Sequence, residues 1–291
     1  MQEALAISNV PAGDDTARAF RGAEARGEYS VEDWLDLHGL STRHCEAVLS
    51  RAVYSGDGDP SSRARPTGLT GDRAWKVAAT AIEAAFPQAS ATIDRVRMNT
   101  LRVFGGDTAR APRPFTLAGP NGRPIVVLRY RGRIGDLITV AHEFGHAVQI
   151  AASANRFVPP VNREICAFVS ELALLRHLGI KFPAMHGPAM AAWQARNADY
   201  LGRHATELAL ALKDPEAVYR YSWNYPIARV LASECFAQLP GDPLWAIFEN
   251  RLPLSGIATF LGCAHRSSPS CNGACMTMAP PTFRVPVTLH Q

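Results

Sequence analysis

The chain has 291 residues, of which 47% are hydrophobic and 19% charged, and its formal net charge is +4. This composition excludes a fibrous or disordered chain, and the length allows one large domain or a catalytic domain with small additions. The basic residues are scattered and the net charge is small, so neither nucleic acid nor a membrane surface is an expected partner.

The N-terminal residues 1–29 are rich in Ala, Gly and polar residues without a helical or strand period, which predicts a mobile segment. They contain neither the basic nor the apolar region of a signal peptide, and no stretch of the chain approaches the roughly 20 apolar residues of a membrane helix. We therefore expect a cytoplasmic protein, with export lacking a cleaved signal as the open alternative.

Two short helices are predicted within residues 30–55, with Ser30 and Ser41 as their N-caps and Gly39 between them. A helix-turn-helix could have this pattern, but the second helix offers few polar residues that could read DNA. A helical appendage that packs on the rest of the protein is therefore favoured. The Gly, Pro and Ser content of residues 56–71 then predicts a linker.

The main domain is expected over residues 72–262, beginning with a helix that Asp72 can cap. The β-rich run Arg123–Tyr130, bounded by glycine-containing turns, predicts a strand or one arm of a hairpin. Later helices include a long alanine-rich one over roughly Pro188–Lys213 and one that restarts near Pro226. One strand region among several helices predicts a mainly helical, α+β fold.

The segment DLITVAHEFGHAVQIAA, residues 136–152, has the apolar spacing of a helix, and residues four apart share one helical face. His142 and His146 therefore point the same way, and Glu143 follows His142 by about 100°, which is the HExxH arrangement of zinc enzymes. Gly145 costs about 1 kcal/mol relative to Ala in a helix, which predicts the close approach of another backbone. The alternative is an ordinary amphipathic helix with two polar histidines.

A catalytic zinc takes three protein ligands, and the next predicted helix offers Glu164, Glu171 and His177 as the third. His177 lies near the end of that helix, where the helix dipole accounts for it. Glu171 lies in an apolar run, where a buried carboxylate needs a cation or a metal. Glu164 could orient a ligating histidine, but a solvated acid in the first helical turn is slightly favoured.

The segment GDLITVAHEFGHAVQ resembles the active-site helix of the thimet oligopeptidase and oligoendopeptidase F family of gluzincin metallopeptidases, and FVSELA is similar to the family's segment with the glutamate ligand. The resemblance implies a zincin-like catalytic domain with the HExxH helix, a second ligand-bearing helix and a small β-sheet or hairpin beside the site. It also implies one Zn²⁺ per chain, held by His142, His146 and Glu171, with Glu143 as the catalytic base.

The segment YRYSWNYP is similar to that family's tyrosine-rich segment, whose hydroxyl groups donate to the developing oxyanion. The resemblance implies this role for Tyr221, with Tyr219 and Tyr225 as alternatives, while a packing stripe is the other interpretation of all three. The chain is about half the family's usual length, so it resembles a short form that lacks much of the N-terminal helical half.

The C-terminal tail, 263–291, contains Cys263, His265, Cys271 and Cys275, which could supply four ligands to a second metal. Their spacing does not match the paired CxxC of zinc ribbons, so free thiols or a disulfide are the favoured interpretation.

These features predict a zinc-dependent metallopeptidase that hydrolyses peptide bonds of a peptide or protein substrate by Glu143-assisted attack of zinc-bound water. The strand Arg123–Tyr130 is expected to pair with the extended substrate. Two alternatives are kept. One is a metalloenzyme on the same scaffold with non-peptidase chemistry; the other is a binding or regulatory protein that engages DNA or a partner through residues 30–53.

Overall fold

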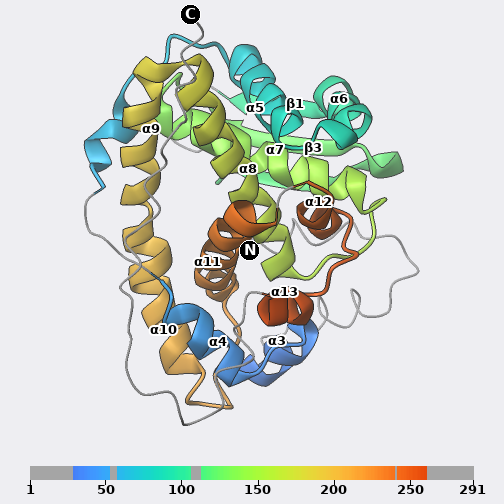
Figure 1. The fold of residues 1–291 in the computed structure, drawn as a ribbon, viewed down its shortest axis with the longest axis vertical. Coiled ribbons are helices and arrows are strands. Elements are labelled where there is room, and N and C mark those ends of the chain that lie inside the picture. The colour runs from blue at the N-terminus through green and yellow to red at the C-terminus, as the bar shows by residue number, and fades with distance from the viewer. Residues whose placement is uncertain (1–28, 53–57, 106–112, 240, 261–291) are drawn as a thin grey trace, which may run out of the picture.

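The protein is mainly helical with a small β-sheet, as the computed structural model shows for residues 29–52, 58–105, 113–239 and 241–260 (Figure 1). The α+β fold class predicted from the sequence is therefore confirmed at this level.

Two of the sequence predictions lie outside the described residues. The proposed mobile N-terminus, apart from Tyr29, is one of them. The tail with the four candidate ligands Cys263, His265, Cys271 and Cys275 is the other.

The regular elements are labelled as in Figure 1. The α-helices are α3 (Val31–His38), α4 (Thr42–Leu49), α5 (Gly71–Ala85), α6 (Ser90–Asn99), α7 (Ile134–Ala152), α8 (Pro160–Lys181), α9 (Pro183–Ala195), α10 (His204–Ala211), α11 (Asn224–Gln238), α12 (Asp242–Phe248) and α13 (Leu254–Phe260). The strands are β1 (Leu101–Gly105), β2 (Phe115–Ala118) and β3 (Pro124–Arg129), and the short helices are η1 (Pro60–Ala64), η2 (Pro87–Ala89), η3 (Pro120–Gly122), the π-helix η4 (Ala198–Arg203) and η5 (Tyr221–Trp223).

The three strands form one sheet in the order β1-β3-β2, with β1 parallel and β2 antiparallel to β3. Strand β3 alternates between buried and half-buried residues, with Val126 and Leu128 facing the core. The strand predicted from the sequence is thus present, but it is the central one. The expectation that it pairs with substrate is wrong, because β1 and β2 already occupy both of its edges.

Helices α7 and α8 pass side by side through the middle of the molecule (Figure 1). They touch at Gly145, where an added Cβ atom would lie 2.8 Å from Ser170 Cβ and 2.9 Å from Ala167 Cα. Real Cβ atoms do not approach other atoms so closely. The glycine therefore lets the two helices come into backbone contact, as its position in the sequence predicted.

Helices α3 and α4 begin at the predicted caps, Ser30 and Ser41. They are joined to the core by a fully buried residue, Trp34, whose indole Nε1 donates to Asn224 Oδ1 on α11 at 2.8 Å. The imidazole of His38 accepts from the backbone N–H of Val161, in the first turn of α8, at 3.1 Å. These helices are thus part of the core that holds α8.

The described part of the predicted linker also contacts the core. The backbone N–H groups of Thr67 and Ile134 donate to Gly132 and Arg65 at 2.8 and 2.9 Å, which ties this segment to the start of α7. The following helix, α5, begins under a Thr70 cap that accepts from Arg73 N–H, rather than under Asp72.

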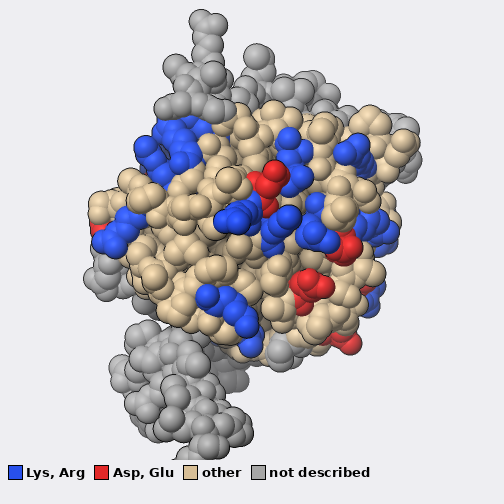
Figure 2. Space-filling model, turned by 90° about the horizontal axis from the view of Figure 1, so that it is seen from above, with Lys and Arg blue, Asp and Glu red and all other residues tan. Residues whose placement is uncertain are grey.

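The long helix predicted over Pro188–Lys213 is divided into α9, η4 and α10, which run in that order along one side of the molecule (Figure 1). No helix among the described residues is long and apolar enough to cross a membrane. On the face seen in Figure 2, Lys and Arg side chains are spread among other residues, with acidic side chains between several of them.

Candidate metal centre

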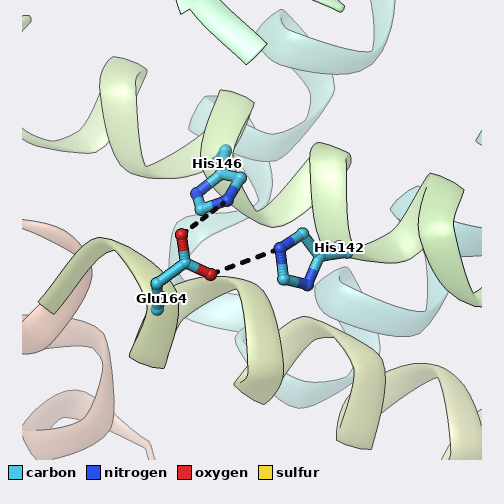
Figure 3. Close-up of side chains that lie close together, drawn as sticks. All are labelled: His142, His146 and Glu164. Atoms are coloured by element: carbon cyan, nitrogen blue, oxygen red, sulfur yellow. Dashed lines mark ion pairs between the residues drawn. The ribbon is translucent and has the colours of Figure 1, made fainter. Parts of the chain in front are cut away.

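Three side chains from two helices meet at the contact between α7 and α8. The possible ligand atoms of His142, His146 and Glu164 all lie within 4.8 Å of one another. Figure 3 shows both imidazole rings facing the carboxylate, with 3.4 Å from His142 Nε2 to Glu164 Oε2 and 3.6 Å from His146 Nε2 to Glu164 Oε1. Two imidazoles and one carboxylate are the donors of a His₂Glu zinc site. In the part of the chain that the structure describes, no other such group is present.

The donor set fits a cation for a second reason. Glu164 Oε2 is buried and accepts no hydrogen bond from the residues that the structure describes, and the side chain is only 2% exposed. Burial by itself raises the pKa of Glu164, but the neighbouring His146 and His142 and the Tyr221 hydroxyl lower it to about 2. A buried, ionised carboxylate with an unsatisfied oxygen is costly unless a cation completes its environment.

The burial of Glu164 corrects the interpretation of this residue as a solvated acid in the first helical turn. Helix α8 begins at Pro160, with Pro159 as its cap. Glu164 therefore lies beyond the first turn, on the side of α8 that faces the two histidines (Figure 3).

Glu171, which the resemblance implied as the third ligand, lies on the other side of the His142 ring. Its Oε1 is 2.9 Å from His142 Nδ1, and its Oε2 accepts from Arg229 Nη1 at 2.7 Å. Arg196 Nη1 lies 3.4 Å from Oε1. Glu171 is fully buried, as predicted, but arginines balance its charge. The group that could hold a metal ion therefore contains Glu164 as its third residue, and Glu171 lies outside it.

The protonation of these groups follows their contacts. Burial by itself raises the pKa of Glu171, but the hydrogen bond from His142 and the charge of Arg229 lower it to about 2. Burial lowers the pKa of His142, but its contacts with Glu164 and Glu171 raise it well above the ordinary value. Burial lowers the pKa of His146 to about 3, so this ring is neutral and can donate a lone pair.

The side chain of Glu143, the predicted base, is hydrogen-bonded to a residue of the sheet. Its side chain is buried, and its Oε2 accepts from Thr116 Oγ1 on β2 at 2.7 Å. Burial raises the pKa of Glu143, and His142 and Thr116 partly oppose this shift. A carboxyl group with a raised pKa can accept and return a proton closer to neutral pH. Thr116 was missed in the sequence because a four-residue strand has too short a period to be recognised.

The three tyrosines have different surroundings. The Tyr221 hydroxyl donates to Glu164 Oε1 at 2.7 Å, so this phenol reaches the candidate metal centre. The Tyr219 hydroxyl accepts from Asn224 Nδ2 at 2.7 Å, and its ring packs in the core. Tyr225 lies beside Tyr221, with 5.8 Å between ring centroids. The hydrogen bond to Glu164 therefore favours Tyr221, the tyrosine that the resemblance also preferred.

An aromatic cluster continues from this position. It contains Phe168, Tyr200, His204 and Tyr225, with centroid separations between neighbours of 5.2 to 6.5 Å. Phe168 also lies 5.4 Å from the His142 ring. Tyr200 belongs to the π-helix η4, a local geometry that is frequent at functional sites. No pattern in the sequence indicates Tyr200 or His204, because their contacts with Phe168 and Tyr225 arise only from the packing of η4 and α10.

Comparisons with known proteins identify no relative. No family model, no curated protein and no solved structure matches this chain.

Proposed function

We propose that this protein is a zinc-dependent hydrolase that cleaves peptide bonds, with His142, His146 and Glu164 as the zinc ligands and Glu143 as the catalytic base. The observation that carries the proposal is the buried His142–His146–Glu164 group, in which one carboxylate oxygen has no partner. The resemblance of the sequence to the thimet oligopeptidase and oligoendopeptidase F family supports the choice of peptide as substrate. Exchanging Glu171 for Glu164 as the ligand leaves the two histidines and the base unchanged.

The residues around the group account for the steps of hydrolysis. When bound, zinc supplies a Lewis acid that polarises the scissile carbonyl and lowers the pKa of water toward about 7. Glu143 takes the proton from the attacking water and gives it to the leaving amine. Thr116 holds one oxygen of that carboxylate and so fixes its orientation.

The sheet offers a place for an extended substrate. Strand β2 carries Thr116, and within the described ranges no strand pairs with its edge opposite β3. An extended peptide can add to such an edge through backbone hydrogen bonds. In this proposal β2 takes the role that the sequence had suggested for β3, because its edge lies next to the base.

The test combines metal analysis with cleavage of a mixed peptide library, read by mass spectrometry. We expect wild-type protein to hold about one zinc per chain and to cleave peptides, as expected for three protein ligands with an open fourth position. Glu143→Gln should keep the zinc but lose cleavage, because the amide cannot act as a base. Glu164→Ala should lose the zinc, whereas Glu171→Gln should still bind it when zinc is in excess.

The outcomes separate the alternatives. Cleavage by Glu143→Gln at the wild-type rate would contradict the proposed base. Full zinc content in Glu164→Ala would contradict the ligand assignment. A zinc-loaded protein that cleaves no peptide in the library would instead favour a metalloenzyme with other chemistry.

A further inference from the structure

The His142 ring is contacted by a carboxylate at each of its two nitrogens. Glu164 Oε2 lies 3.4 Å from Nε2, and Glu171 Oε1 lies 2.9 Å from Nδ1. A neutral imidazole has one N–H donor and one lone pair, so only one of these nitrogens can bind a metal. When a metal takes the place of the Nε2 proton, the carboxylate of Glu171 still accepts from the remaining Nδ1–H, so the nitrogen left to bind the metal is Nε2, on the side of Glu164. Glu171 therefore fixes both the tautomer and the orientation of the ring.

The position of Glu171 is in turn fixed from α11. Arg229 Nη1 donates to Glu171 Oε2 at 2.7 Å, and the Arg229 side chain is 1% exposed. Its other donors are also engaged, since Nε donates to Asn197 Oδ1 at 3.0 Å and Nη2 donates to the Trp193 carbonyl at 2.9 Å. The guanidinium lies 3.5 Å from the centroid of the Trp193 ring. Arg229 is thus held in one geometry and presents a fixed donor to the glutamate.

The two glutamates differ in the charge that faces them. Glu171 is paired with Arg229 and with Arg196. In the described ranges of the chain no arginine lies within ion-pair distance of Glu164, whose partners there are Tyr221 and the imidazoles. The carboxylate paired with arginine is therefore held on the Nδ1 side of His142, whereas Glu164 faces Nε2, the side on which a metal would bind.

We propose that Arg229 is a positioning residue that sets the metal affinity of this centre by holding Glu171 against His142 Nδ1. The inference rests on the proposed function in one respect, that His142 is a metal ligand. Outer hydrogen bonds to a ligating histidine commonly change metal affinity by about 10 to 100-fold. Arg229 lies on α11, so the packing of α11 contributes to the metal affinity of a centre whose ligands lie on α7 and α8.

The experiment measures zinc affinity of the folded protein by competition with a chromophoric chelator, in a double-mutant cycle of Arg229→Met and Glu171→Gln. Each single variant should bind zinc about 10-fold or more weakly. The double variant should bind no more weakly than Glu171→Gln alone, because Arg229 acts only through Glu171. Fully additive losses, or wild-type affinity in Arg229→Met, would overturn the inference.

A matched control distinguishes this role from general destabilisation. Arg51 pairs with a different glutamate, Glu234, also on α11, at 2.9 Å. Arg51→Met should leave zinc affinity and the visible spectrum of the Co²⁺-substituted protein unchanged, whereas Arg229→Met should alter both. A spectrum identical to wild type in Arg229→Met would speak against a change at the His142 ligand.

The remaining outcomes separate the failure of this inference from the failure of the proposed function. If Arg229→Met does not fold, Arg196→Met removes the other arginine on Glu171, and unchanged zinc affinity in that variant would count against the inference. Wild-type protein that binds no zinc would refute the proposed function and this inference together. Zinc binding that is equal in wild type and Arg229→Met would refute the inference alone.

Discussion

Three buried glutamates lie around the same pair of histidines. They differ in the groups that donate hydrogen bonds to them, and we infer different roles from these donors. Glu143 accepts from the Thr116 hydroxyl on the sheet. Glu164 accepts from the Tyr221 hydroxyl and retains one oxygen without a hydrogen bond. Glu171 is neutralised by arginine. A carboxylate already balanced by arginines gains little from a metal, whereas one that faces only imidazoles, whose protons a metal can replace, gains more.

The contact between Tyr221 and Glu164 makes a kinetic prediction. If the Tyr221 hydroxyl also donates to the oxyanion, Tyr221→Phe should lower kcat by roughly 100-fold with little change in KM, because such a donor acts mainly in the transition state. Steady-state kinetics on a cleavable peptide, with zinc content confirmed, would measure this.

Tyr219→Phe is the matched control for that prediction, because it removes a hydroxyl that bonds Asn224 in the core. It should change stability more than kcat. If Tyr221→Phe retained wild-type kcat, the oxyanion role would be wrong and the phenol would serve only to hold Glu164.

Helices carry the site, and the contacts between helices therefore decide its geometry. The α7–α8 contact at Gly145 brings the two histidines onto Glu164. The α3–α8 contact at His38 fixes the first turn of α8, one turn before Glu164.

The Gly145 contact predicts a loss of stability on adding one methyl group. Gly145→Ala improves helix propensity, but its Cβ would overlap Ser170 and Ala167, so the free energy of unfolding should fall by about 1–3 kcal/mol. Gly179, also on α8, would place an added Cβ no closer than 3.4 Å to its nearest atoms, which belong to the His186 side chain. Gly179→Ala should therefore raise stability by up to about 1 kcal/mol. Urea denaturation of both variants tests the contrast, and equal effects would contradict the close approach.

His38 predicts a pH-dependent stability. Burial lowers the pKa of His38 from 6.5 to about 4, against the opposing hydrogen bond from Nδ1 to the Trp34 carbonyl. A lowered pKa means that the folded state prefers the neutral ring. The stabilisation is fully present above about pH 6.5 and is lost as the pH falls toward 4, because a protonated Nε2 cannot accept from Val161 N–H.

The measurement compares wild type with His38→Gln, which stays neutral at every pH. The difference in free energy of unfolding between them should decrease by about 3 kcal/mol from pH 7 to pH 4, at 1.36 kcal/mol per pKa unit. Other titrating groups are common to both proteins and cancel. A constant difference over this range would show that His38 is not held neutral by burial.

Across the whole molecule, segments that the sequence divided into an appendage, a linker and a main domain contribute to one packed core. Trp34, from the first of these segments, is fully buried beside α11. Arg65, from the second, bonds the first residue of α7. The site therefore depends on segments at both ends of the described chain, since α3 supports α8 and α11 supplies Arg229.

The sequence determined the features that depend on short separations along the chain. The shared face of His142 and His146 follows from their spacing of four, and the caps Ser30 and Ser41 follow from local hydrogen bonds. The close contact at Gly145 also followed from the cost of a glycine inside a helix.

Only the tertiary structure decided the third member of the metal group. The sequence showed that a buried Glu171 needs a cation, but it did not show which one, because Arg229 lies 58 residues further along the chain. With that arginine in place, Glu171 is satisfied, and within the described residues the carboxylate left without an arginine is Glu164. The sequence could not predict that β2 lies beside Glu143 for the same physical reason, because Thr116 and Glu143 are 27 residues apart in the chain. Charge balance in a buried site is set by contacts in space, and the spacing of residues in a sequence does not specify them.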